Sequence, residues 1–189
     1  MSGVGHPPTV LVVMAVSGSG KTTVAALLAG RSGWAFEDGD DLHPEANLDK
    51  MHARTPLNDE ERWPWLRAIA AWIDERRASG GHGVVACSAL RRAHRDVPRS
   101  GRPDVGLVHV KGDRGLIPRR QAARHGHFMP TGFIRSQSTI LEEPKADEDA
   151  IVVSVEIRPR EIVAAVLRAL GPVPPVGPLA LDKGWEPFA

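Results

Sequence analysis

The stretch AVSGSGKTT, which runs from Ala15 to Thr23, decides the fold of this chain. It departs from the phosphate-loop pattern G-x-x-x-x-G-K-[ST] only where Ala15 replaces the first glycine. In such a loop, glycines let backbone N–H groups approach a polyphosphate, a lysine reaches the β- and γ-phosphates, and a hydroxyl faces Mg²⁺. The sequence therefore predicts a nucleotide site, with Thr22 toward Mg²⁺ and with these residues around the phosphates: Ser17, Gly18, Ser19, Gly20, Lys21, Thr22 and Thr23.

The segments on either side of this loop agree with that prediction. Residues 9–16 form an apolar, β-branched run that is typical of a buried strand, and residues 21–31 carry apolar side chains at helical spacing. A helix that begins at the loop directs its N-terminus at the anion. Ala15 fits the turn from strand to loop provided that its φ is negative. An ordinary glycine-rich turn is the alternative, but motif and context together favour nucleotide binding.

Further apolar runs alternate with amphipathic stretches along the chain. Strands are expected at 34–37, 83–87, 105–110 and 151–155, and helices at 60–79 and 162–170. This alternation predicts an α/β fold with five strands in a parallel sheet. Because proline is tolerated only in the first turn of a helix, Pro64 places the start of the long helix near residues 60–63.

The segment EDGDDLHP, residues 37–44, follows the second expected strand. The carboxyl ends of neighbouring parallel strands share one crevice, which places Asp40 opposite the γ-phosphate. A carboxylate there can accept a hydrogen bond from an attacking hydroxyl, or hold Mg²⁺ through water. A solvated turn explains the same residues equally well, since Asp-Gly is a common turn dipeptide. Spacing alone leaves both interpretations open.

A second group of basic residues lies near the middle of the chain. Arg120 and Arg124 are four residues apart and so share one face of a helix. They can clamp the phosphates of ATP and close over the reaction as a lid. The alternative is a basic surface face, which is the commoner fate of such residues. The glycine-containing run that follows, GHFMP, slightly favours the lid.

Composition excludes several classes of protein. The net charge of +1 gives no reason to expect nucleic acid or an anionic membrane as a partner. The single cysteine cannot form an internal disulfide, and the first residues lack the charged start of a secretion signal, so we expect a cytoplasmic protein with no membrane span. The cysteine and the scattered histidines show no metal-ligand spacing.

Taken in order, the motifs resemble those of gluconokinase, a family of small P-loop kinases that phosphorylate D-gluconate to 6-phospho-D-gluconate with ATP. The resemblance runs from about residue 10 to residue 170. It is carried by VSGSGKT, DGDDLHP, NLDKM, TPLNDEERWPWL, CSALRRAHRD, LVHVKGD and R-x-x-x-R-x-G-H-F. The DGDDLHP and PLNDEERWPWL blocks are the specific ones. The sequence departs from the family at Ala15 and at the Arg91-Arg92 pair, where lysines are common.

The resemblance implies a three-layer fold like that of nucleoside monophosphate kinases, with a kinase domain over 1–171 and a lid around 120–135. It also implies a homodimer that uses ATP and Mg²⁺. It assigns catalysis to Lys21, Asp40, Arg120 and Arg124, the two arginines also binding ATP. It also implies that Ser88 binds a water molecule that is coordinated to Mg²⁺. The residues with chemistry suited to a polyol carboxylate are Asp40, His43, Lys50, Arg62 and Arg95.

Three alternatives remain beside the gluconate kinase. A related small-molecule kinase with a shikimate-like or nucleoside monophosphate acceptor is disfavoured by the DGDDLHP block. A nucleotide-binding switch that transfers nothing predicts a dispensable Asp40, whereas a lid serves to exclude water during chemistry. A nucleic-acid-binding ATPase finds no support in the net charge. The Pro-rich tail, residues 172–189, is either disordered or docked on this or a neighbouring subunit.

Overall fold

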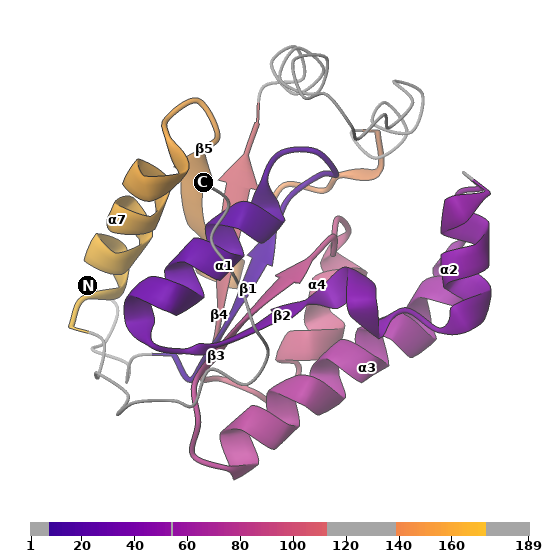
Figure 1. The fold of residues 1–189 in the computed structure, drawn as a ribbon, viewed down its shortest axis with the longest axis horizontal. Coiled ribbons are helices and arrows are strands. Elements are labelled where there is room, and N and C mark those ends of the chain that lie inside the picture. Colours follow the sequence, from indigo (N-terminus) through magenta and orange to yellow (C-terminus); the bar gives the residue numbers. More distant parts are fainter. Residues whose placement is uncertain (1–7, 54, 113–138, 173–189) are drawn as a thin grey trace.

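Strand β1, Val10–Met14, is apolar at every position because both faces of its sheet are covered. The computed structural model describes residues 8–53, 55–112 and 139–172, and in it β1 is the central strand of five. Helices lie on both sides of the sheet, so that no side chain of β1 meets water (Figure 1). The phosphate loop therefore follows a strand that is buried at every position.

The sheet is parallel throughout, in the order β2-β3-β1-β4-β5. Val10 at the start of β1 pairs with Gly83 on one side and with Val105 on the other. The five expected strands are confirmed within about two residues, and the other four are β2 Ala35–Asp38, β3 Gly83–Cys87, β4 Val105–Lys111 and β5 Ile151–Ser154. Because the strands run the same way, the loops after β1, β2 and β3 meet at one edge.

Two hydrophobic clusters fill the space between the sheet and its helices. Helices α1 (Lys21–Ser32) and α7 (Pro159–Leu170) share one cluster with Leu11 and Val13 of β1. Helix α3 (Asp59–Ala78) shares the other with Val12 and Met14, and α4 (Arg92–Arg99) packs beside α3. The alternation of β1 side chains between the two clusters is the period-two pattern of a strand with both faces buried.

Helix α3 begins at Asp59, one residue before the range of 60–63 that the sequence predicts for its start. Asn58 accepts a hydrogen bond from the backbone N–H of Glu61, and the Glu61 carboxylate accepts one from the backbone N–H of Asn58. This reciprocal capping fixes the start of the helix at Asp59 and leaves Pro64 in the second turn. Pro64 costs the helix the hydrogen bond to the carbonyl of Glu60, a cost that the cap and the buried face of α3 offset.

The short elements were not predicted. They are η1 (Gly39–Leu42), α2 (Glu45–His52), α4 and η2 (Ala146–Glu148), and none is long enough to show a clear apolar period. The expected lid around 120–135 and its Arg120 and Arg124 lie outside the described residues, as do residues 173–189 of the tail, so these remain predictions. Among the helices of the described ranges, none has the length and apolar character needed to cross a membrane.

Candidate active site

The phosphate loop has the backbone that its glycines predict. Gly18 and Gly20 have φ of 79° and 87°, in the left-handed region that side chains disfavour, and α1 begins directly after Gly20. Ala15 keeps a negative φ, since Asp149 is the one non-glycine residue with positive φ in the part of the chain that is described. The replacement of glycine by Ala15 is therefore tolerated without strain.

One side chain of the loop, that of Ser19, is buried without a hydrogen-bond partner for its Oγ among the described residues. An unsatisfied buried hydroxyl is costly, and a phosphate oxygen at the N-terminus of α1 would accept its hydrogen bond. Ser17 is also buried, while Thr22 is partly buried and Thr23 is exposed. The predicted loop residues thus lie together at the start of α1, in a setting that fits an anion.

Lys21 and Asp40 meet across the edge of the sheet. The Nζ of Lys21 lies 3.8 Å from Oδ2 of Asp40, although the two residues follow different strands. The Lys21 side chain is 7% exposed and the Asp40 side chain 43% exposed. The structure therefore brings the loop lysine and the predicted acceptor-side carboxylate together, with the carboxylate open to an incoming molecule.

Asp38 is a candidate site residue that the sequence reasoning missed. Its carboxylate accepts hydrogen bonds from the backbone N–H of Asp40, at 3.2 Å, and from the side chain of Thr22. Burial raises the pKa of Asp38, and these hydrogen bonds work against that rise. The signal in the sequence was the D-G-D spacing, which puts two carboxylates at the end of β2. Only the fold shows that the first of them contacts the loop threonine.

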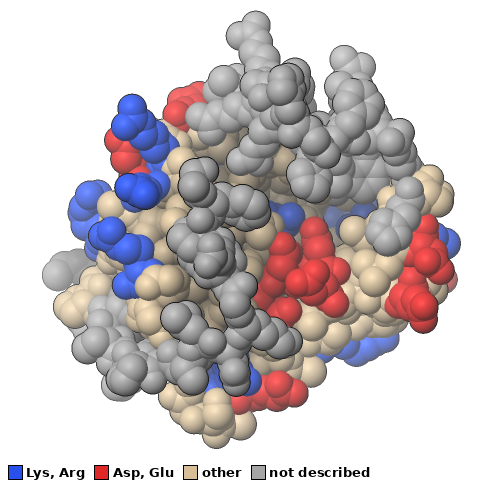
Figure 2. Space-filling view, viewed as in Figure 1, with Lys and Arg blue, Asp and Glu red and all other residues tan. Residues whose placement is uncertain are grey.

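The turn that carries these two carboxylates is held closely against β3. A Cβ on Gly39 would lie 2.3 Å from the carbonyl oxygen of Ala86, so no other residue fits there without a shift. On the other side, the indole Nε1 of Trp65 donates a hydrogen bond to the carbonyl of Gly39 at 2.5 Å. Helix α3 and strand β3 together position η1, which begins at Gly39. Figure 2 shows acidic side chains gathered on the molecular face at this turn.

His43 lies at the end of the same turn and packs on α3. Its ring stacks on Trp65, with centroids 4.3 Å apart and planes inclined by 11°. Its Nδ1 is 3.3 Å from the amide nitrogen of Asn47, on α2. Burial lowers the pKa of His43 to about 4, an effect that nearby Asp40 opposes. The ring is therefore uncharged at neutral pH.

Arg62 is a buried guanidinium that forms no ion pair with a carboxylate among the described residues. Its Nε and Nη2 both donate to the carbonyl of Leu57 at 3.3 Å, and no described carboxylate lies within 4 Å of it. Burial lowers the pKa of Arg62. Lys50, by contrast, forms an ion pair with Glu61 and is about half exposed. Of these two predicted cations, Arg62 retains the unmet demand for an anion.

The structure argues against the substrate role predicted for Arg95. Its side chain is 1% exposed and forms a paired contact with Glu148, with Nε to Oε2 at 2.6 Å and Nη2 to Oε1 at 3.0 Å. Its Nη1 donates to the carbonyls of Leu90 and Glu142. Since nearly all of its donors are satisfied inside the protein, these contacts favour a structural role, and the substrate role of Arg95 stays a prediction.

Thr22, Asp38 and Ser88 provide the oxygen atoms that suit a magnesium ion. Ser88 is buried and follows Cys87 at the end of β3, which pairs with Met14 just before the phosphate loop. Hydroxyl and carboxylate oxygens are the ligands that Mg²⁺ prefers. No group of three His, Cys, Asp or Glu side chains suited to a metal occurs within the described residues. The site therefore fits an ion held mainly by phosphate oxygens and water.

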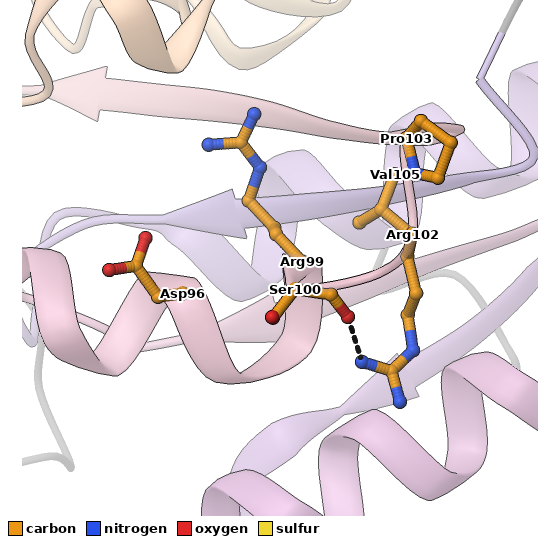
Figure 3. Close-up of a pocket in the computed structure, with 6 residues that line it drawn as sticks. All are labelled: Asp96, Arg99, Ser100, Arg102, Pro103 and Val105. Atoms are coloured by element: carbon orange, nitrogen blue, oxygen red, sulfur yellow. Dashed lines mark hydrogen bonds between the residues drawn. The ribbon is translucent and has the colours of Figure 1, made fainter.

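A separate cavity lies at the other end of the sheet. It has a volume of about 370 Å³ and is lined at the C-terminal end of α4 and the start of β4 by Asp96, Arg99, Ser100, Arg102, Pro103 and Val105. In Figure 3 the Arg99 and Arg102 side chains diverge, and Arg102 donates to the carbonyl of Ser100. Arg102 is also paired with Asp74. This cavity is thus distinct from the phosphate loop.

Comparison with known proteins gives a consistent result. The chain is 45% identical to a probable gluconokinase of Rattus norvegicus over 181 residues, covering 86% of this chain and 98% of that protein. It is 43% identical to a gluconokinase of Gluconobacter oxydans, covering 87% of this chain and 92% of that protein. A solved gluconokinase from Sinorhizobium meliloti superposes with a TM-score of 0.78, at 40% identity, covering 87% of this chain and 91% of that one. No protein-family model matches the chain.

The match covers more than nine tenths of each of these relatives, at well above 30% identity, and the solved structure has the same fold as this chain. The chain belongs to the gluconokinase family.

Proposed function

We propose that this chain transfers the γ-phosphoryl group of ATP to the 6-hydroxyl of D-gluconate, giving 6-phospho-D-gluconate and ADP. The relatives that cover most of the chain are named gluconokinases. The observation that carries the proposal is the contact of Lys21 with Asp40 at 3.8 Å, because it joins the nucleotide side of the site to the acceptor side.

The donor side is built by the loop and the N-terminus of α1. Backbone N–H groups of residues 17–22 and the Ser19 hydroxyl would bind the phosphates of ATP. Lys21 would neutralise the charge that develops on the transferred group. Arg120 and Arg124, from the predicted lid, would add to this neutralisation. Phosphoryl transfer relies mostly on such positioning and charge stabilisation.

On the acceptor side, Asp40 would orient the 6-hydroxyl and take its proton. The hydroxyl oxygen forms a bond to the γ-phosphorus, the bond from that phosphorus to the β,γ-bridging oxygen breaks, and ADP leaves with the electron pair. The 43% exposure of the Asp40 side chain supports this role, since a substrate can reach it. Its Oδ2 lies 3.8 Å from Nζ of Lys21, so a hydroxyl that it binds would lie close to the phosphate end of the site.

The carboxylate of gluconate would pair with Arg62. Lys50 is paired with Glu61 and Arg95 with Glu148, which leaves Arg62 as the buried predicted cation without a described carboxylate partner. A guanidinium binds a carboxylate with two parallel hydrogen bonds. An anionic acceptor would give this guanidinium the ion-pair partner that the described carboxylates do not provide.

Magnesium would be held by Thr22, with Asp38 and Ser88 reaching it through water. When bound, the ion neutralises negative charge on the phosphates. The protein's own contribution is the hydrogen bond from Thr22 to Asp38, which fixes the threonine hydroxyl. A cytoplasmic location and a homodimer remain predictions from the sequence and the family resemblance.

A coupled assay for ADP release tests the proposal against its alternatives. ATP and Mg²⁺ would be supplied with D-gluconate, shikimate, other sugar acids or nucleoside monophosphates. We expect turnover that depends on gluconate. Turnover with shikimate or a nucleoside monophosphate instead would indicate a related kinase. Tight ATP binding with no acceptor-dependent turnover would indicate a nucleotide-binding switch.

A further inference from the structure

Two contacts and burial fix the ring of His43. It stacks on Trp65, its Nδ1 lies 3.3 Å from the Asn47 amide nitrogen, and its side chain is buried. Asn47 is itself buried, and its amide nitrogen also lies 2.8 Å from the backbone carbonyl oxygen of Glu61. One amide group thus links α2, α3 and the turn that carries Asp40.

The orientation of the Asn47 amide follows from the Glu61 carbonyl. A carbonyl oxygen only accepts hydrogen bonds, so the group that faces it must be the NH₂ of Asn47 and not its oxygen. The same nitrogen faces Nδ1 of His43, and an amide nitrogen only donates. Nδ1 must therefore accept, without a proton of its own. In a neutral imidazole the proton then resides on Nε2.

We infer that Asn47 is a positioning residue that holds His43 as the neutral Nε2–H tautomer, so that the ring offers the acceptor sugar a hydrogen-bond donor without a charge. The role toward the sugar rests on the proposed function, whereas the tautomer assignment stands without it. An imidazolium would carry an N–H on Nδ1 and so would need an acceptor where the Asn47 amide presents a donor, and it would compete with Lys21 for Asp40. A neutral donor leaves Asp40 to the hydroxyl that is to be phosphorylated.

The surrounding charges agree with an uncharged ring. Asp40 from η1 favours protonation, while Arg62 from α3 and Lys21 from α1 oppose it, and burial opposes it most. These groups lie close enough to shift the pKa of His43, which places the ring at the border of the site. The ring is therefore within electrostatic reach of both Asp40 and Arg62, which we propose for the hydroxyl and the carboxylate of the acceptor.

Nitrogen NMR of the full chain labelled with ¹⁵N-histidine tests the tautomer directly, with His43→Gln used to assign the signal. The protonated and unprotonated ring nitrogens have well-separated shifts. We expect Nδ1 to be unprotonated and Nε2 protonated from pH 8 down to about pH 5, since the pKa of His43 is about 4. A proton on Nδ1, or titration near pH 6.5, would overturn the assignment. This measurement on the unsubstituted chain needs no variant to fold at position 47.

Kinetics test the positioning role. Asn47→Asp replaces the donor by an acceptor, so we expect the proton to move to Nδ1, the pKa of His43 to rise, and kcat/KM for gluconate to fall about tenfold with KM for ATP unchanged. Asn58→Asp is the matched control, because it adds the same charge near the same helix and keeps an oxygen that caps α3. We expect that control to retain the activity of the unsubstituted chain.

The two tests separate this inference from the proposed function. If Asn47→Asp shifts the tautomer but loses no more activity than Asn58→Asp, Asn47 has no positioning role. If the predicted tautomer is present but the unsubstituted chain does not phosphorylate gluconate, the proposed function fails and the tautomer assignment stands. If gluconate is phosphorylated but the proton lies on Nδ1, the inference fails alone.

Discussion

The Nζ of Lys21 lies 3.8 Å from Oδ2 of Asp40, which links the first residue of α1 to the turn after β2. The two strands that lead to these residues are not adjacent, since β3 lies between β1 and β2. Their loops meet because all three strands run in the same direction and end at the same edge. The predictions below concern residues at or around this contact.

Lys21→Ala should lower kcat by about a thousandfold, since it removes a cation that stabilises the transferred phosphoryl group. The fold should persist, because the lysine contributes an ion pair at the site and no core packing. Steady-state kinetics and thermal unfolding check both statements. Arg168→Ala, at an exposed position of α7, serves as the control for loss of one positive charge. Full activity in Lys21→Ala would rule out the phosphate-loop assignment.

Asp40→Asn should lower kcat by a factor of about 10² to 10⁴ while leaving KM for ATP little changed, as expected for the loss of a general base. The neighbouring Asp41→Asn makes the same change at an exposed position of the same turn. We expect Asp41→Asn to be nearly as active as the unsubstituted chain. Equal activity of the two variants would mean that Asp40 has no catalytic role and belongs to a solvated turn.

Arg62→Met should raise KM for gluconate at least tenfold, because a charge-assisted hydrogen bond to the substrate carboxylate is lost. KM for ATP should stay within about twofold, since the nucleotide is held by the loop. Arg67→Met, on the exposed side of the same helix, is the matched control. An unchanged KM for gluconate in Arg62→Met would mean that another cation holds the carboxylate.

Gly39→Ala should impair catalysis by displacing the turn that carries Asp38 and Asp40. The added Cβ would lie 2.3 Å from the carbonyl oxygen of Ala86, which belongs to the central part of the sheet and cannot yield. Gly30→Ala is the control, because nothing lies within 4 Å of its added Cβ and alanine favours a helix by about 1 kcal/mol. We expect Gly30→Ala to be active and slightly more stable; a fully active Gly39→Ala would show that the turn need not be held.

The pair of Arg95 and Glu148 should support stability and not substrate binding. Arg95→Met leaves a buried carboxylate unpaired and should cost about 3–5 kcal/mol, whereas combining it with Glu148→Leu should restore much of that loss. The double variant should keep the KM for gluconate of the unsubstituted chain. Denaturant unfolding and steady-state kinetics check these outcomes, and a raised KM in a well-folded double variant would restore the substrate role for Arg95.

The pair of Arg95 and Glu148 also makes the free energy of unfolding depend on pH in the acid range. The hydrogen bonds from Arg95 lower the pKa of Glu148 from 4.5 to about 2. A lowered carboxyl pKa gives stability that is present above pH 4.5 and is lost as pH falls toward 2. Glu148→Gln should remove this contribution, so its unfolding free energy should fall less steeply between pH 4.5 and 2. Parallel pH profiles for the two proteins would contradict the assigned pair.

The strands and the loop could be predicted from the sequence because their signals are local. Five apolar runs and a glycine-rich motif give the sheet and the start of α1 without any knowledge of distant contacts. The choice between a site and a solvated turn at Asp40 could not be made from spacing, since it depends on the contact with Lys21. Asp38 was missed because only the packed turn shows which of two nearby carboxylates reaches Thr22.

Arg95 shows that a motif can also suggest a binding role for a residue whose contacts lie inside the protein. It lies in a specific motif and has the right charge, but its partner Glu148 is 53 residues further along the chain. No local pattern reveals such a pair. Likewise, the start of α3 was predicted from Pro64 alone, and the spacing of Asn58 to Glu61, which marks the cap, was not used. Long-range pairing is what the fold was needed to resolve.

The most direct test of the account is the identity of the product. The chain would be incubated with ATP, Mg²⁺ and ¹³C-labelled D-gluconate, and the product examined by ³¹P and ¹³C NMR. The account predicts a single phosphorylated product with phosphorus coupling to C6, formed in equal amount to ADP. Phosphorylation at another carbon, or ADP formed without any phosphorylated sugar acid, would contradict it.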